Sequence, residues 1–365
     1  MPETFIAQLS DKLSKRRDEL KTNLHQSGKR IDAEFRAAVL DHWHSPLPPR
    51  ANGQKRPAYA IDGSRRRANL TNGSTVFVAQ ALIMGEDINE PVTDVEILPG
   101  TVRAETMDRF ADLMLRELEI HLAREYAERI PEGSILYLDG AIYGMLPQLY
   151  PLRSEGIPED RDYATMLLED YRKLFDLCES RHIVLVAISK TNRQALFSKK
   201  LQMQIGRSEI MEISDSALFD ELTERKIGFS TPLLLGTYSF EQGKSNVVLE
   251  GANVQDEPAI LSFFVRLDDM DDALRVDVPS ICVGRQERIG DVVWDLVIPP
   301  DCIIPIVQLL SSDYGGLQVY NALMYVTDME VRLSKDKMYN IYLPMVSEVL
   351  GEELRIDRSE RRFVE

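Results

Sequence analysis

The order in which apolar strands and amphipathic helices follow one another constrains the fold of this chain more than any other feature. Three strand-like segments, separated by turn signals, come first, at Tyr59–Ser64, Thr75–Met84 and Val92–Leu98. Beyond them helices and apolar strands alternate, at 102–130, Ile135–Asp139, 160–181 and Ile183–Ile188. A doubly wound fold would alternate from its first strand, so this order predicts a mixed sheet instead.

Strands first and alternation afterwards is the order of an RNase H-like core. We therefore predict an α/β protein with an RNase H-like mixed β-sheet flanked by helices. The region 200–300 is expected to add short helices and strands, including strands at Ile260–Arg266 and Asp291–Val297. Residues 303–333 are expected to be helical, and residues 338–365 to trail off as polar chain.

The start of the chain predicts a separate helical arm. Residues 3 to about 43 show helical periodicity, with an apolar stripe that begins with Phe5 and Leu9. The proline-rich segment that follows ends this helix, because proline lacks a backbone donor and disfavours helix before it. We divide the chain into a helical arm for docking or dimerisation (1–45), a Pro-rich linker (46–57), the α/β domain (58–345) and a polar C-terminal tail (346–365).

Composition limits the class of protein. The chain has 365 residues, of which 44% are hydrophobic, enough for a large core. It has no apolar run of membrane-spanning length and no apolar signal segment at its start, so we expect a soluble cytoplasmic protein that does not contact membrane. Its three cysteines are far apart and match no metal-ligand spacing, which disfavours a zinc site and a disulfide framework.

The net charge of −16 argues against simple binding to nucleic acid, because neutralised phosphates supply most of the non-specific affinity. Two features weaken that argument. Positive charge is concentrated locally in the run Arg65, Arg66 and Arg67. In addition, carboxylates gathered to hold a divalent metal add negative charge that the metal offsets.

Two aspartates follow apolar strands and precede glycines. Asp62 follows Tyr59-Ala-Ile and precedes Gly63-Ser64, and Asp139 follows Ile-Leu-Tyr-Leu and precedes Gly140. Hard divalent cations such as Mg²⁺ and Mn²⁺ prefer oxygen ligands, and two such ions can activate water and stabilise the leaving oxygen in phosphodiester cleavage. A single Asp-Gly pair is more often only a turn. The repetition of the pair after two strands favours a metal site that holds about two ions.

The helix 102–130 offers two glutamates as a third ligand. At about 100° per residue, Glu119 falls on the apolar stripe, whereas Glu117 shares its side with His121 and Arg124. A carboxylate on a buried stripe is costly unless a metal compensates it, so Glu119 is preferred and Glu117 is held in reserve. Both could also be ordinary solvated charges.

Further residues are weaker candidates for the same site. Lys190, at the end of the strand Ile183–Ile188, could contact a phosphate or lie on the surface. Asp328, on the late helix, could add a metal ligand or face solvent. The side chains expected to contact nucleic acid are Arg65, Arg66, Arg67, Arg193, Tyr314 and Asn321, although runs of arginine are usually solvated.

In combination these motifs resemble the NurA family of nucleases. Ala60-Ile-Asp-Gly-Ser64 is similar to the opening motif of that family, and a helix glutamate, Leu138-Asp-Gly140 and Ile188-Ser-Lys190 follow in the family's order. The resemblance implies that Asp62, Glu119 and Asp139 bind metal and that Lys190 supports catalysis. It extends from about residue 58 to residue 333.

The resemblance also implies an activity and partners. It implies a Mn²⁺-dependent (or Mg²⁺-dependent) nuclease that cuts single-stranded DNA, digests duplex ends from 5′ to 3′ and takes part in DNA end resection for recombinational repair. It further implies a homodimer that works with a HerA-like hexameric ATPase. The chain has no GxxxxGK[ST] loop, so a motor of that kind must be another chain.

One position departs from the family pattern. Family members often carry a histidine in the late helix after a Tyr-Pro element, whereas Tyr314-Gly315 stands here for Tyr-Pro and Asn321 for the histidine. An asparagine cannot shuttle a proton near neutral pH. This departure and the net acidity leave open a non-catalytic scaffold or loading subunit of a DNA translocase. An actin-like or sugar-kinase-like ATPase also stays open, because such proteins share an RNase H-like core and place Asp and Gly at a strand–turn.

Overall fold

The structure is a computed structural model. It describes residues 3–24, 31–50, 56–146, 149, 155–158, 161–190, 193–207, 213–237, 248–249, 252–317 and 319–361. Residues 51–55 of the expected linker and 362–365 of the expected tail lie outside this part. Within it, no helix has both the length and the hydropathy needed to cross a membrane.

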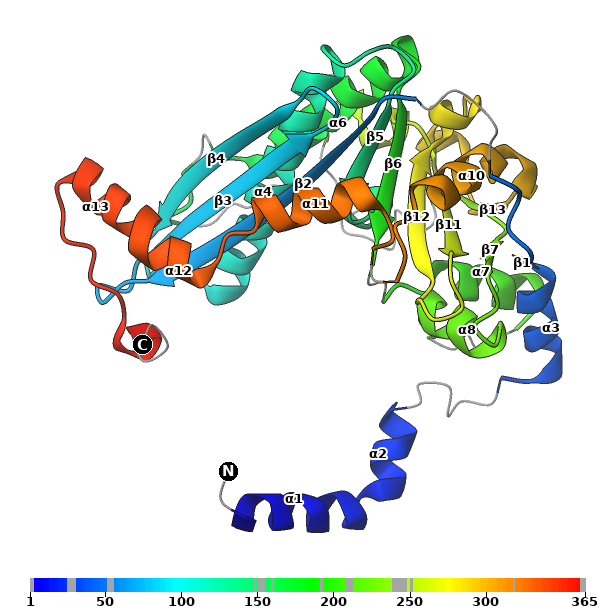
Figure 1. The fold of residues 1–365 in the computed structure, drawn as a ribbon, viewed down its shortest axis with the longest axis horizontal. Coiled ribbons are helices and arrows are strands. Elements are labelled where there is room, and N and C mark those ends of the chain that lie inside the picture. Colours follow the sequence, from blue (N-terminus) through cyan, green and yellow to red (C-terminus); the bar gives the residue numbers. More distant parts are fainter. Residues whose placement is uncertain are drawn as a thin grey trace.

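A large mixed sheet forms the centre of the molecule (Figure 1). Its first half is an antiparallel meander followed by two parallel strands: β2 (Ala58–Asn69), β3 (Thr75–Met84), β4 (Asn89–Leu98), β5 (Ile135–Asp139) and β6 (Val184–Ser189). In space the order is β4-β3-β2-β5-β6. This arrangement confirms the predicted RNase H-like mixed sheet.

Antiparallel strands extend the sheet beyond β6. They are β12 (Leu274–Pro279), β11 (Ile260–Arg266), β7 (Gly228–Ser230) and β1 (Trp43–His44). In addition, β8 (Leu233–Leu235) pairs with β11, and β13 (Leu296–Val297) pairs with β8. A strand was expected over 291–297, but only its last two residues pair. Residues 289–291 form a 3-10 turn instead, in which the Asp291 side chain accepts a hydrogen bond from the Arg288 backbone.

Helices cover both faces of the sheet. On one face lie α4 (Ala104–Ala127) and α6 (Tyr163–Ser180), and on the other lie α10 (Ile304–Asp313) and α11 (Ala322–Val331) (Figure 1). Successive strand residues point to opposite faces, so Ile61 and Leu138 pack in the first core and Ala60 and Tyr137 in the second. The late region 303–333, which was expected to be helical, contains these two helices, with residues 314–321 between them.

Smaller elements fill the remaining described chain. They are α5 (Ile142–Met145), α7 (Leu196–Gln204), α8 (Asp215–Leu222), β9 (Val248–Leu249), β10 (Ala252–Asn253) and the 3-10 segments Val254–Asp256, Ser280–Val283 and Pro300–Ile303. In α8, the Asp215 side chain accepts hydrogen bonds from three backbone amides at the start of α7, which holds these two helices together.

The N-terminal region differs from the single expected helix. It forms α1 (Glu3–Lys15), α2 (Arg17–Leu24) and α3 (Ala33–Asp41). Asp32 starts α3 by accepting a hydrogen bond from the Phe35 amide, and Phe35 and Val39 are fully buried in the main core. Residues from about 31 onward therefore belong to the main body, and only α1 and α2 extend away from it (Figure 1).

The C-terminal region is also more structured than predicted. It contains α12 (Lys335–Lys337), a π-helical turn (Met338–Tyr342), α13 (Leu343–Leu350) and α14 (Arg358–Arg361). Apolar side chains of this region, among them Met338 and Leu343, pack on Ala68, Val76 and Val78 of the meander. The expectation of a polar trailing segment is wrong, because apolar residues one helical turn apart bury one side of this region.

Candidate active site

Asp62 and Asp139 lie on adjacent parallel strands. The register pairs Ile61 with Leu138, so the two aspartates follow the last pair of the β2–β5 ladder side by side. Contrary to the expectation, Asp62 does not end its strand, because β2 continues to pair with β3 as far as Asn69. The expected turn at Gly63 is overridden by this antiparallel partner. What ends at Ile61 is the pairing with β5, which leaves room beside Asp62.

Glu119 reaches the same place from α4. A Cβ atom added to Gly63 would lie 2.6 Å from Oε1 of Glu119, so the missing side chain of this glycine makes room for the carboxylate. Oε2 of Glu119 lies 2.9 Å from Nη1 of Arg116, which also donates a 2.8 Å hydrogen bond to the Asp139 carbonyl oxygen. Arg116 thus ties α4 to the end of β5.

The pKa values of the Asp62 and Glu119 carboxyl groups are strongly raised. Burial, together with the carboxylates of Asp139 and Glu119, raises the pKa of Asp62 to about 8. Burial also raises the pKa of Glu119 to about 7, although Arg116 opposes the rise. Carboxylates held close together in a poorly solvated place repel one another, and a bound cation would relieve that repulsion.

Lys190 and Tyr320 border the Asp139 side of the site. Nζ of Lys190 lies 3.7 Å from Oδ2 of Asp139 and 5.2 Å from the centre of the Tyr320 ring. Burial and the carboxylates of Asp139 and Asp62 raise the pKa of Tyr320 above its usual range, and its hydroxyl group hydrogen-bonds Asp139. Tyr320 therefore keeps its proton and can donate it in a hydrogen bond.

The late helix presents Asp328 to the site. The carboxylate of Asp328 contributes to the raised pKa of Asp62 and to that of Tyr320. Asn321 does not share this position: it is 1% exposed, and its side chain accepts a hydrogen bond from the Met324 amide at the start of α11. The expectation that Asn321 contacts nucleic acid is corrected by this burial, which makes it a helix cap.

A cavity of about 350 Å³ opens beside Lys190 and Asp328. Its lining residues are Lys190, Leu267, Asp271, Asp272, Leu274, Tyr314, Tyr320, Tyr325 and Asp328. Tyr314 is held by a 2.5 Å hydrogen bond from its hydroxyl to Oδ2 of Asp271. Three tyrosines and one lysine thus line a hollow next to the carboxylates.

The predicted arginines lie elsewhere. Arg65 and Arg67 point toward α4 and form ion pairs with Asp112 and Asp108, respectively. Arg66 points to the other face and donates to the Leu333 carbonyl oxygen. Arg193 is exposed in the segment before α7. These contacts give the triplet a role within the fold that the charge run alone does not reveal.

Glu117, the reserve ligand, is not part of this site. It lies on the other side of α4 with His121, as the helical register predicts, and Asp170 of α6 completes that group. Within the described chain, this is the one group whose three potential ligand atoms all lie within 4.8 Å of one another. The carboxylates of Asp62, Glu119 and Asp139 are thus more widely spread.

Two residues of the site were not predicted. Arg116 precedes Glu119 by one turn of α4, a spacing that brings opposite charges together and could have been recognised. Tyr320 lies in the irregular segment between α10 and α11, and no sequence pattern places such a segment next to Asp62 in β2 and Asp139 at the end of β5. Its proximity to Asp139 comes from the tertiary fold.

Solved structures of known proteins share this fold. The NurA nuclease from Sulfolobus solfataricus is 16% identical, with a TM-score of 0.58 over 94% of this chain and 97% of that one. A NurA structure bound to dAMP and manganese is 13% identical, with a TM-score of 0.59 over 93% and 97% of the two chains. A third, NurA with manganese, is 14% identical, with a TM-score of 0.57 over 93% and 98%.

Sequence comparison gives a consistent result. No curated protein matches this chain. The family model described as the NurA domain matches residues 56–317, which include β2 with Asp62, α4 with Glu119 and β5 with Asp139. Since this match covers well over half of the chain and the fold agrees over nearly all of it, the chain belongs to the NurA family of nucleases.

Proposed function

We propose that this protein is a metal-dependent deoxyribonuclease whose active site is formed by Asp62, Glu119 and Asp139. The observation that carries the proposal is the convergence of these carboxylates from β2, α4 and β5. Asp62 is 5% exposed and Glu119 6%. Arg116 pairs with Glu119 and Lys190 lies beside Asp139, whereas no described cation forms an ion pair with the buried Asp62. Burial of a carboxylate without a cation is costly, so the convergence supports a site for divalent metal.

The donor set fits Mn²⁺ or Mg²⁺. It consists of carboxylate oxygens, the ligands these hard cations prefer, and NurA structures in the comparison contain manganese. Asp62, Glu119 and Asp139 would hold about two ions, with Asp328 as a further ligand. The metal would supply a water of lowered pKa and neutralise charge on the phosphate.

Side chains around the carboxylates suit a nucleic-acid substrate. Lys190 can bind a phosphate oxygen next to Asp139, and Tyr320 can donate a hydrogen bond to that phosphate. The rings of Tyr314 and Tyr325 in the neighbouring cavity offer surfaces on which a base can stack. One NurA structure in the comparison is bound to dAMP, which supports a deoxynucleotide substrate.

The finer activity belongs to the same proposal. We propose cleavage of single-stranded DNA and 5′-to-3′ digestion of duplex ends during DNA end resection in the cytoplasm. A net charge of −16 predicts weak binding to DNA by the protein alone. A HerA-like hexameric ATPase would raise the local concentration of DNA at the site. Phe5, Ile6, Leu9 and Leu13 of α1, each at least half exposed, are proposed to dock on it.

The test is cleavage of labelled single-stranded and duplex DNA in Mn²⁺, Mg²⁺ or EDTA. We expect metal-dependent cleavage that Asp62→Asn and Asp139→Asn each reduce at least about tenfold, because the metal loses a ligand. Glu105→Gln, an exposed change on α4, is the control. Cleavage above a tenth of wild type in either aspartate variant contradicts the assignment. Metal-independent binding of DNA without cleavage would favour a scaffold, and DNA-independent ATP hydrolysis would favour an ATPase.

A further inference from the structure

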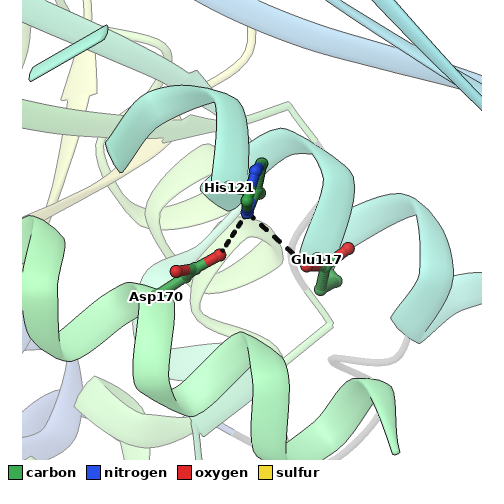
Figure 2. Close-up of side chains that lie close together, drawn as sticks. All are labelled: Glu117, His121 and Asp170. Atoms are coloured by element: carbon green, nitrogen blue, oxygen red, sulfur yellow. Dashed lines mark hydrogen bonds and ion pairs between the residues drawn. The ribbon is translucent and has the colours of Figure 1, made fainter. Parts of the chain in front are cut away.

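A second group of potential metal ligands lies on the side of α4 that points away from Glu119. Nδ1 of His121 is 2.8 Å from Oδ2 of Asp170 and 3.9 Å from Oε1 of Glu117. Glu117 and His121 are one turn apart on α4, and Asp170 comes from α6, which packs against it. The three side chains point toward one another (Figure 2).

Glu117 is the part of this group that internal contacts do not explain. It is 6% exposed, and no described residue donates a hydrogen bond to its carboxylate. Its nearest cationic partner is His121, at 3.9 Å, and that ring is charged only when protonated. Internal contacts alone therefore do not offset the burial of this carboxylate, and its orientation toward a histidine and an aspartate is suited to binding a cation.

We propose that Glu117, His121 and Asp170 bind one divalent transition-metal ion, with Zn²⁺ as the best match. An imidazole with two carboxylates is a ligand set for first-row transition metals, whereas Mg²⁺ and Ca²⁺ prefer oxygen alone. Ligand atoms around a tetrahedral zinc lie about 3.3 Å apart, given zinc–ligand distances of about 2.0–2.1 Å. The observed separations of 2.8 and 3.9 Å bracket this value.

Arg124 is compatible with such a site. Its Nε lies 3.2 Å from Oδ1 of Asp170, the oxygen that does not face His121, so this contact orients the ligand. Its Nη2 lies 3.2 Å from Nδ1 of His121 and would have to move when Nδ1 binds metal. The side chain of Arg124 is 23% exposed and can make that movement toward solvent. The His121 side chain is 43% exposed, which leaves water access to the remaining coordination position.

A metal ion at this site would stabilise the packing of α4 against α6 and would not take part in catalysis. It joins α4 to α6, and Glu119 lies two residues from Glu117 on the same helix. The proposal does not rest on the nuclease function, because its ligands are separate from Asp62, Glu119 and Asp139.

The test uses Co²⁺ as a spectroscopic probe and Zn²⁺ as competitor, in full-length protein that carries Asp139→Asn to weaken the candidate active site. We expect one Co²⁺ per chain with visible absorption, displaced by Zn²⁺, and an increase in melting temperature with Zn²⁺. His121→Gln, at a half-exposed position, should weaken binding at least about tenfold. Glu125→Gln, an exposed change on the same helix, should leave it unchanged.

A second variant, Asp170→Asn, and circular dichroism distinguish a loss of metal binding from a loss of folding. Asp170→Asn should also lose the Zn²⁺-dependent rise in melting temperature while keeping its helical signal. Absorption and melting shifts that are the same with and without His121→Gln overturn the proposal. So does the absence of Co²⁺ binding in the parent protein.

Discussion

At the scale of single residues, Asp62 links the chemistry of the site to the stability of the chain. Its pKa is about 8 in the folded protein, whereas that of an unfolded aspartate is about 3.9. Between these values the folded state holds a proton that the unfolded state has released. The free energy of unfolding of the metal-free protein therefore falls as the pH rises through this interval.

Asp62→Asn removes this dependence. In EDTA, the variant should melt close to wild type near pH 4 and at increasingly higher temperature than wild type up to pH 9. Melting curves at intervals of one pH unit, with Glu105→Gln as control, measure the difference. A constant offset between the two proteins would show that Asp62 keeps its charge in the folded state.

Glu119 and Glu117 differ in role although both are buried and two residues apart. Glu119→Gln should reduce Mn²⁺-dependent cleavage at least about tenfold, because its carboxylate faces Asp62 and Asp139. Glu117→Gln, measured in Mn²⁺ with zinc excluded, should stay near wild type. Loss of cleavage in Glu117→Gln alone would assign the catalytic ligand to the other side of α4.

At the scale of elements, the contact between β2 and α4 depends on one glycine. A Cβ atom at Gly63 would meet Oε1 of Glu119 at 2.6 Å and Cδ1 of Leu115 at 2.7 Å. Gly63→Ala should therefore displace the side chains of Glu119 and Leu115, cost about 1–3 kcal/mol in stability and lower cleavage more than the loss of stability explains. Gly144→Ala, whose nearest contact would be 3.4 Å, is the matched control. Full activity in Gly63→Ala would separate Glu119 from catalysis.

The strands could be predicted where their pattern is self-contained. β3, β5 and β11 have the predicted bounds, because apolar residues with turn signals on both sides specify a strand locally. β2 is twice as long as predicted, since Asp62-Gly63-Ser64 has the composition of a turn and only the partner β3 keeps it extended. Local pattern thus failed where a tertiary partner decides the conformation.

The site was predictable to a similar extent. Asp62 and Asp139 could be placed side by side, because each follows an apolar strand of the predicted sheet. The helical register put Glu117 with His121 and Glu119 on the opposite side, which the structure confirms. Tyr320 could not be found, because an irregular segment brings it to the site. The burial of Asn321 could not be predicted from the sequence for the same reason.

At the scale of the whole molecule, the boundary of the N-terminal arm can be tested by truncation. A chain starting at Ile31 keeps α3 and β1 and should melt within about 2 °C of the full-length protein. A chain starting at Arg56 lacks the fully buried Phe35 and Val39 and should lose several kcal/mol, about 3–5 kcal/mol from the phenylalanine alone.

The same truncation tests the partners. Light scattering should show a homodimer for the full-length chain, and the HerA-like ATPase with ATP should raise duplex digestion. The chain starting at Ile31 should keep cleavage of single strands and lose the stimulation, because it lacks the apolar side of α1. Equal stimulation of both chains would exclude α1 as the docking element.

Tyr320 and Asp328 close the site from a segment that lies beyond the NurA-domain match and follows β2, α4 and β5 in the sequence. During synthesis, β2, α4 and β5 leave the ribosome long before this segment does. A nascent chain can therefore fold its sheet and still lack one wall of the site.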